Sequence, residues 1–141
     1  RLRASPLARR LAAQRGVEVT VIVPEKNDSR LVHYASRGRY ETLTRAGVHI
    51  ATFAGGLLHT KTITVDGDFC LFGSVNLDMR SFWLNFEMTL FVYDREFTGR
   101  VRELQQSYLK HCTPRDLESF ENRPFRERLM ENIALLVGPL L

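Results

Sequence analysis

The spacing of apolar side chains predicts alternating helices and strands over the first third of the chain. Residues 7–15 mix apolar and basic positions in the manner of an amphipathic helix, and a glycine follows them. The run Val17–Val23 is β-branched and largely apolar, as expected for a buried strand. A second helix over residues 30–46 should end at Gly47, before a second strand at Val48–Phe53. This order favours a parallel sheet covered by helices.

The middle of the chain predicts antiparallel pairing instead. Residues 59–65 alternate between polar and apolar side chains, Asp66-Gly67 is a tight-turn signal, and Phe69–Phe72 reads as the return strand of a hairpin. Residues 85–93 alternate again and predict a third strand. One face of that strand carries Phe86, Met88, Leu90 and Val92, and the other carries Glu87, Thr89 and Phe91.

The last part of the chain reads as helical. Residues 95–111 form one predicted helix, and Thr113-Pro114 is a typical start for another, with Thr as the cap and Pro in the first turn. The first helix has an apolar stripe of Phe97, Val101, Leu104 and Leu109. A second stripe at helical spacing consists of Leu129, Ile133, Leu136, Val137 and Leu140. We expect this second stripe to pack on the domain, with docking on a membrane surface as the alternative.

Composition limits the class of protein. The chain has 141 residues, of which 44% are hydrophobic and 26% charged, as in a folded domain rather than a disordered or fibrous one. Cys70 and Cys112 lack a CxxC pattern and are interpreted as small core residues. No apolar run reaches the roughly 20 residues that span a bilayer. The sequence begins without Met or a signal peptide, so it looks like a piece of a longer protein.

Charge is spread unevenly along the chain. Residues 1–50 hold ten Lys or Arg against four Asp or Glu, whereas residues 51–141 hold ten against twelve. A basic first third suits an anionic partner such as phospholipid headgroups or nucleic acid, and a solvated basic surface is the alternative.

Two pairs of polar residues carry the candidate chemistry. His59 and Lys61 lie two apart on one strand, so their side chains leave the same face, and Ser74 and Asn76 have the same spacing at the end of the return strand. Pairing around the turn can bring both pairs to one point. An imidazole, an ammonium, an amide and a hydroxyl there would suit a phosphate group.

Glu87 is the remaining candidate. It is an acid on an otherwise apolar strand, where an unpaired carboxylate would be costly. A hydrogen bond from one imidazole nitrogen of His59 would satisfy it and leave the other nitrogen free to attack or to transfer a proton.

Other polar features have weaker support. The loop Glu25–Ser29 follows a predicted strand, and both a role at a substrate entrance and a plain connection remain open. His33, His49 and His111 have no motif around them and are interpreted as structural or solvent-facing histidines.

The pattern His-x-Lys-x4-Asp-x6-Gly-Ser-x-Asn resembles the HKD signature of the phospholipase D superfamily. Its residues are His59, Lys61, Asp66, Gly73, Ser74 and Asn76. Asp66 belongs to the signature, although a DG turn alone also accounts for it. The wider context resembles the C-terminal half of bacterial cardiolipin synthases. That context consists of Pro24-Glu-Lys-Asn-Asp-Ser29, His33-Tyr-Ala-Ser36, Gly56-Leu-Leu-His59, Asn76-Leu-Asp-Met-Arg-Ser81 and Leu84-Asn-Phe-Glu87.

The resemblance implies a fold and an activity. The fold is an α/β half-domain with a mixed sheet flanked by helices over residues 1–112, followed by a helical tail at 113–141. The activity is phosphatidyl transfer that forms cardiolipin from phosphatidylglycerol through a phosphohistidine. His59, Lys61 and Asp66 would be catalytic, Lys61, Ser74 and Asn76 would bind phosphate, and Glu87 would orient His59. No metal or other cofactor is implied.

The resemblance also implies a missing partner, because members use two HKD motifs and this chain has one. We expect the other in a missing N-terminal half, with His59 as either the acid/base or the nucleophile. The setting would be the bacterial inner membrane, reached through segments outside this chain and by peripheral contact with anionic phospholipid. One alternative is a homodimeric single-motif phosphodiesterase acting on nucleic acid, although the wider context favours lipid. Another is a half that binds an anionic headgroup without turnover.

Overall fold

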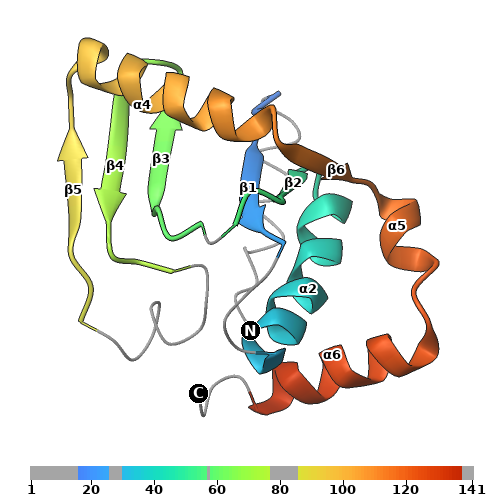
Figure 1. The fold of residues 1–141 in the computed structure, drawn as a ribbon. Coiled ribbons are helices and arrows are strands. Elements are labelled where there is room, and N and C mark those ends of the chain that lie inside the picture. Colours follow the sequence, from blue (N-terminus) through green and yellow to red (C-terminus); the bar gives the residue numbers. More distant parts are fainter. Residues whose placement is uncertain (1–15, 26–29, 57, 77–85, 138–141) are drawn as a thin grey trace.

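The computed structural model describes residues 16–25, 30–56, 58–76 and 86–137. Within them, the strands are β1 (Thr20–Pro24), β2 (His49–Phe53), β3 (Thr62–Val65), β4 (Phe69–Gly73), β5 (Thr89–Val92) and β6 (Cys112–Arg115). The helices are α2 (Arg30–Arg45), α4 (Arg95–Leu109), α5 (Leu117–Glu121) and α6 (Phe125–Val137). The predicted α/β class is confirmed, although the strands form two three-stranded sheets flanked by helices (Figure 1).

The first sheet has the strand order β1-β2-β6. As predicted, β1 and β2 are parallel, with Thr20 opposite His49, and α2 makes the crossover between them. The predicted stop at Gly47 is confirmed: its φ is 89°, and the amide of Val48 donates to the carbonyl of Leu43. This is the Schellman arrangement, which favours glycine because the turn needs a left-handed residue. The helix predicted over residues 7–15 lies outside the described residues.

The helix predicted to start at Thr113 is wrong. Residues 112–115 form β6, which pairs antiparallel with β2 and sets Thr113 opposite Thr52. Pro114 is compatible with this strand because β6 lies at the sheet edge, where a missing amide proton need not break a ladder. The following helix α5 begins at Leu117, and its cap is Asp116, whose carboxylate accepts the amide of Ser119 at 2.9 Å.

The second sheet is antiparallel with the order β3-β4-β5. The predicted hairpin is confirmed: Val65 lies opposite Phe69, and the turn residues Asp66 and Gly67 both have positive φ, 50° and 79°. Such a turn needs a residue that tolerates the left-handed region, and Asp is one of the few besides Gly. The strand predicted over 85–93 is shorter, with β5 covering only Thr89–Val92.

Helix α4 contacts the second sheet with a face other than the predicted apolar stripe (Figure 1). The side chain of Gln105 bridges Thr62 and Thr64 of β3, and Thr98 is fully buried. Most of the predicted stripe is instead exposed, namely Phe97, Leu104 and Leu109. The contact between α4 and this sheet is therefore partly polar, which a search for apolar periodicity does not detect.

The main core joins the first sheet to α2 and α5. Its buried members are Val23, Tyr40, Ile50 and Phe120. Cys70 is fully buried on β4, as predicted, and Cys112 is half-buried. No helix among the described residues is long and apolar enough to cross a membrane.

Helix α6 packs against α2 with a polar face rather than with the predicted apolar stripe. Leu129 and Ile133 are exposed, whereas Glu131 and Ala134 are buried. The reason is an ion pair between Arg123 and Glu131, both side chains being 4% exposed, which turns the acidic face of α6 inward. The side chains of Leu136 and Val137 and the whole of Leu140 lie outside the described part.

Candidate active site

His59 and Lys61 lie just before β3. The amide of Gly73 donates to the carbonyl of Lys61 at 3.1 Å, so the hairpin pairing continues one residue beyond the strand and sets Lys61 beside Gly73. The ammonium of Lys61 donates to the carbonyl of His59 at 2.9 Å. Lys61 is half-buried and His59 is exposed. The Lys61 ammonium is therefore held at the backbone of His59, and the His59 side chain is open to solvent.

Gly73 makes the close pairing of β4 and β5 possible. A Cβ atom at this position would lie 2.3 Å from the carbonyl oxygen of Met88 and 2.9 Å from the Cα of Thr89. Both neighbours are backbone atoms, so neither can rotate away. The glycine of the signature is thus required by packing at the end of the strand that leads to Ser74.

Ser74 links the end of β4 to the segment that enters β5. Its amide donates to the carbonyl of Met88 at 3.0 Å, and its hydroxyl accepts the amide of Met88 at 3.1 Å. The hydroxyl donates to the carboxylate of Glu87 at 2.5 Å. A serine hydroxyl has one proton, and here that proton goes to Glu87 rather than to a ligand. Phosphate binding by Ser74 stays a prediction, and the observed contact of its hydroxyl is with Glu87.

The register decides which side chains share a face. Because Lys61 lies beside Gly73, strand alternation alone would send Ser74 and Asn76 to the other face. They can reach the face of Lys61 only through the bend that begins at Ser74. The expectation that both pairs leave one face therefore does not follow from the hairpin itself. Asn76 is exposed, and the residues after it, 77–85, lie outside the described part.

The same register bears on His59 and Glu87. Continued past the ladders, it sets His59 opposite Val75, and Val75 opposite Glu87. Strict alternation would then place His59 and Glu87 on one face and Ser74 on the other, but the Ser74 hydroxyl contacts Glu87, so the regular register does not extend through the bend at Ser74. The hydrogen bond predicted between His59 and Glu87 stays a prediction.

Asp66 lies in the hairpin turn, at the far end of β3 from Lys61. Asp66 lies five positions after Lys61 along extended chain, which is about 16 Å at the usual strand rise. Of the two interpretations of Asp66, this position favours the turn over the catalytic role.

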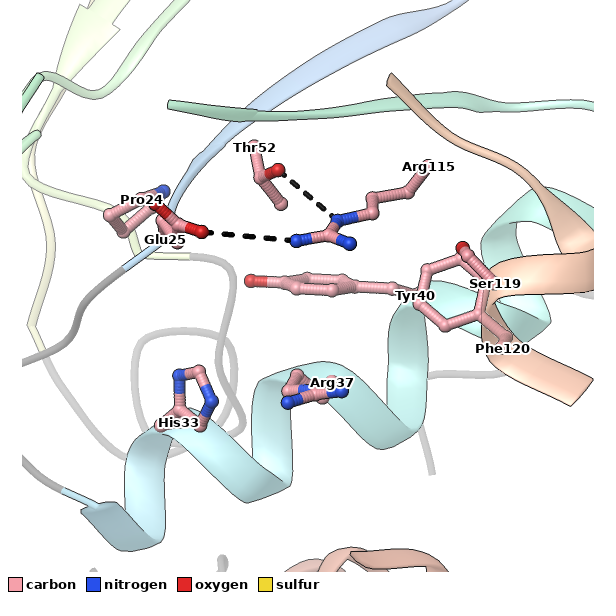
Figure 2. Close-up of a pocket in the computed structure, with 9 residues that line it drawn as sticks. All are labelled: Pro24, Glu25, His33, Arg37, Tyr40, Thr52, Arg115, Ser119 and Phe120. Atoms are coloured by element: carbon pink, nitrogen blue, oxygen red, sulfur yellow. Dashed lines mark hydrogen bonds and ion pairs between the residues drawn. The ribbon is translucent and has the colours of Figure 1, made fainter. Parts of the chain in front are cut away.

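A pocket of about 250 Å³ is a feature that the sequence analysis missed (Figure 2). Its polar lining comes from the residue that follows β1 and from α2, β2, β6 and α5, and it includes Glu25, His33, Tyr40 and Arg115. These residues are far apart in the sequence and match no motif. The one available signal was the position of the loop that starts at Glu25, directly after a strand of a parallel pair.

Fold and motif together define a class of protein. An α/β domain with His-x-Lys entering an antiparallel hairpin and Gly-Ser-x-Asn leaving it is a phospholipase D-like domain. A family model described as "Cardiolipin synthase, PLD-like domain" matches residues 6–109. The chain belongs to this family.

Relatives of the chain agree with this assignment. Cardiolipin synthase A of Cronobacter sakazakii is 49% identical over 130 residues, and that of Proteus mirabilis is 46% identical over the same length. Each match covers 92% of this chain but 27% of the relative, so the chain spans about a quarter of the length of these proteins.

A solved structure shows the same fold. It is a phospholipase D family member, Nuc from Salmonella typhimurium, with a TM-score of 0.66 and 21% sequence identity. The match covers 79% of this chain and 75% of Nuc.

Proposed function

We propose that this chain supplies one of two HKD motifs of an enzyme that forms cardiolipin from phosphatidylglycerol. The observation that carries the proposal is the extent of the likeness to cardiolipin synthase A, which covers 92% of the chain and includes the motif residues. The exposed side chain of His59, together with the Lys61 ammonium held at the His59 backbone, suits work on a phosphodiester.

In the proposed reaction one histidine nitrogen attacks the phosphorus of phosphatidylglycerol. The P–O bond to glycerol breaks, and the other motif's histidine protonates the departing glycerol oxygen. That second histidine then takes the proton from a hydroxyl of another phosphatidylglycerol. The resulting oxygen attacks the phosphohistidine, the P–N bond breaks, and cardiolipin forms. His59 serves in one of these two roles.

The other site residues take supporting roles. Lys61 and Asn76 would stabilise the negative charge that grows on the phosphate oxygens. Glu87 would accept a hydrogen bond from His59 and fix its tautomer, while Ser74 holds the Glu87 carboxylate. Asp66 supports the hairpin. These roles need no metal or other cofactor.

The remaining parts of the proposal lie outside the described residues. A second motif would come from an N-terminal half of the same polypeptide. The enzyme would sit at the bacterial inner membrane through other segments and touch anionic phospholipid peripherally. We also propose the division expected from the sequence, a catalytic half-domain over residues 1–112 and a tail over 113–141. The tail is not purely helical, because its first residues belong to β6 of the first sheet and its Phe120 belongs to the main core.

The test is the variant His59→Ala in the full-length protein, incubated with phosphatidylglycerol. Product formation should be abolished while the circular dichroism spectrum and melting temperature stay near those of the parent. The matched control is His49→Ala, which removes an exposed histidine from the other sheet and should leave turnover unchanged. Unaltered turnover in His59→Ala would overturn the catalytic assignment.

A single-motif enzyme that works as a homodimer is the second candidate. The fold match to Nuc, a phospholipase D family member, supports it, because one domain with this fold accounts for 75% of that chain. Incubating the isolated chain with DNA and with phosphatidylglycerol, each in EDTA, separates the two. Cleavage of DNA by the isolated chain would favour the homodimer. Failure to trap a labelled phosphohistidine in the full-length protein would instead favour a half that binds without turnover.

A further inference from the structure

The pocket beneath Arg115 lies at the edge where the parallel strands end. Pro24 and Glu25 at the end of β1 form one wall, and Thr52 of β2 lies beside them (Figure 2). Open α/β sheets bind ligands outside the carboxyl ends of their parallel strands. In Figure 1, β1 points toward the edge from which β3 starts, so the pocket opens at the same edge as the segment with His59.

Arg115 is held in place but keeps unused hydrogen-bond donors. Its Nε donates to the hydroxyl of Thr52 at 3.2 Å, and that hydroxyl in turn donates to the carbonyl of Thr113 at 3.1 Å. One terminal amino group lies 4.0 Å from a carboxylate oxygen of Glu25, beyond hydrogen-bond distance. A guanidinium has five N–H groups, and among the described residues only one is engaged in a hydrogen bond. The terminal amino groups are therefore available to an anion.

Arg37 forms the opposite wall, and its guanidinium is already paired with carboxylates. It pairs with Glu127 at 3.1 Å and with Glu131 at 3.5 Å, both on α6. Its position is set by these two acids, so Arg115 is the cation that a ligand would meet.

Two neutral donors complete the lining. Burial raises the pKa of Tyr40, and a hydrogen bond with Ser36 opposes this shift, so the Tyr40 hydroxyl stays protonated. That hydroxyl points into the pocket (Figure 2). Burial and the nearby Arg37 lower the pKa of His33, with Glu131 and Glu127 opposing them. At neutral pH the imidazole is uncharged and can donate or accept one hydrogen bond.

We propose that this pocket binds a small phosphate ester that also carries a hydroxyl group, with the phosphate on Arg115 and the hydroxyl donating to Glu25. A carboxylate next to a cation disfavours a simple anion but accepts an alcohol. The volume of about 250 Å³ lies just below the range of about 300–1,000 Å³ typical of drug-sized ligands, so a headgroup-sized molecule fits. None of the residues that line the pocket belongs to the HKD motif, and the proposed binding goes beyond the proposed function.

The test is a titration of the 141-residue chain with sn-glycerol 3-phosphate, followed by NMR. Saturable shifts should appear at the Arg115 Nε–H signal. Arg115→Gln should weaken binding about 10- to 100-fold, because it removes charged hydrogen bonds. The control Arg100→Gln removes an exposed arginine of α4 that pairs only with Glu96, and it should bind as the parent does. An equal loss in both variants, or no saturable shift in the parent, would overturn the site.

Two further variants keep the test independent of folding at Arg115. Tyr40→Phe keeps the core ring and should weaken binding about 2- to 10-fold. Glu25→Gln should strengthen binding of inorganic phosphate and reduce the preference for sn-glycerol 3-phosphate over it. Equal affinity of the parent for the two probes would overturn the role given to Glu25.

Vesicles distinguish the source of the phosphate ester. A lipid headgroup is identified if the chain sediments with pure phosphatidylglycerol vesicles and not with phosphatidylcholine vesicles. Sedimentation with phosphatidylglycerol should then be weaker for Arg115→Gln and unchanged for Arg100→Gln. Saturable binding of sn-glycerol 3-phosphate without that difference on vesicles identifies a soluble ester. Neither measurement involves turnover, so their failure leaves the proposed function untouched.

Discussion

The hydroxyl of Ser74 donates to the carboxylate of Glu87 across 2.5 Å and so joins the end of β4 to the segment that enters β5. The same hydroxyl accepts the amide of Met88 at 3.1 Å. A motif residue is therefore engaged with the acid that we assign to orienting His59. We therefore expect Ser74 to act by positioning Glu87 rather than by binding phosphate directly.

Ser74→Ala in the full-length enzyme should lower kcat about 10- to 100-fold, because hydrogen bonds to charged groups contribute more than neutral ones. If Ser74 acts through Glu87, KM for phosphatidylglycerol should change little, whereas loss of direct phosphate binding would raise KM as well. Steady-state kinetics separate the two outcomes.

Two further variants sharpen this prediction. Ser74→Thr keeps a hydroxyl and should restore most of kcat. Ser107→Ala removes an exposed hydroxyl of α4 that donates only to the carbonyl of Leu104, and it should leave the kinetics unchanged. A full kcat in Ser74→Ala would contradict the positioning role.

Gly73→Ala should destabilise the second sheet, because the added Cβ would meet the backbone of Met88 and Thr89. We expect a loss of about 1–3 kcal/mol in the free energy of unfolding, measured with urea. Gly99→Ala is the matched control. Its added Cβ meets nothing within 4 Å in α4, and it should stabilise the helix by about 0.5–1 kcal/mol. Equal stability of the two variants would contradict the packing argument.

The sequence predicted those parts of the fold that local patterns determine. The crossover through α2 followed from a helix between two apolar strands, and the hairpin followed from Asp66-Gly67 between alternating segments. Strand β6 did not follow, because Thr113-Pro114 satisfies the local rules for a helix start. Its pairing with β2 depends on residues about sixty positions away, which no local rule can include.

The same limit applies to the candidate site. The spacing of the motif identified His59, Lys61 and Ser74, because the signature is contiguous in sequence. The hydrogen bonds from Ser74 to Glu87 and from Arg115 to Thr52 depend on register and on strand order, so only the structure shows them.

The stability of the protein should fall as the pH is lowered through the ordinary His33 pKa of 6.5. Burial and Arg37 lower the pKa of His33 in the folded state. At pH values between this lowered pKa and 6.5, the unfolded chain therefore binds more protons than the folded one. The effect should level off once the folded imidazole is also protonated.

His33→Gln should remove this part of the pH dependence. Urea unfolding at pH values from about 7.5 to about 5.5 covers the range on both sides of the ordinary histidine pKa of about 6.5. His49→Gln removes an exposed histidine and should keep the pH dependence of the parent. An unchanged slope in His33→Gln would show that other groups cause it.

Buried charge holds the last helix in place. Arg123 bonds to Glu131 on α6 and, at 2.5 Å, to Glu41 on α2, and its Nε donates to the carbonyl of Phe120 at 2.6 Å. Arg37 reaches Glu131 from the α2 side at 3.5 Å. Arg123 and Glu131 are both buried, so removing either one leaves the other charge in the interior without its main partner.

Arg123→Ala should therefore destabilise the protein by about 3–5 kcal/mol, because Glu131 would remain buried without its main partner. Adding Glu131→Ala should cost less than the sum of the two single changes, since the stranded charge is then gone. The exposed pair Arg100–Glu96, with side chains 76% and 79% exposed, is the control, and Arg100→Ala should change stability by less than about 1 kcal/mol. Thermal and urea unfolding of Arg123→Ala, Glu131→Ala, the double variant and Arg100→Ala measure this coupling. Strict additivity of the Arg123 and Glu131 changes would show that the two residues act independently.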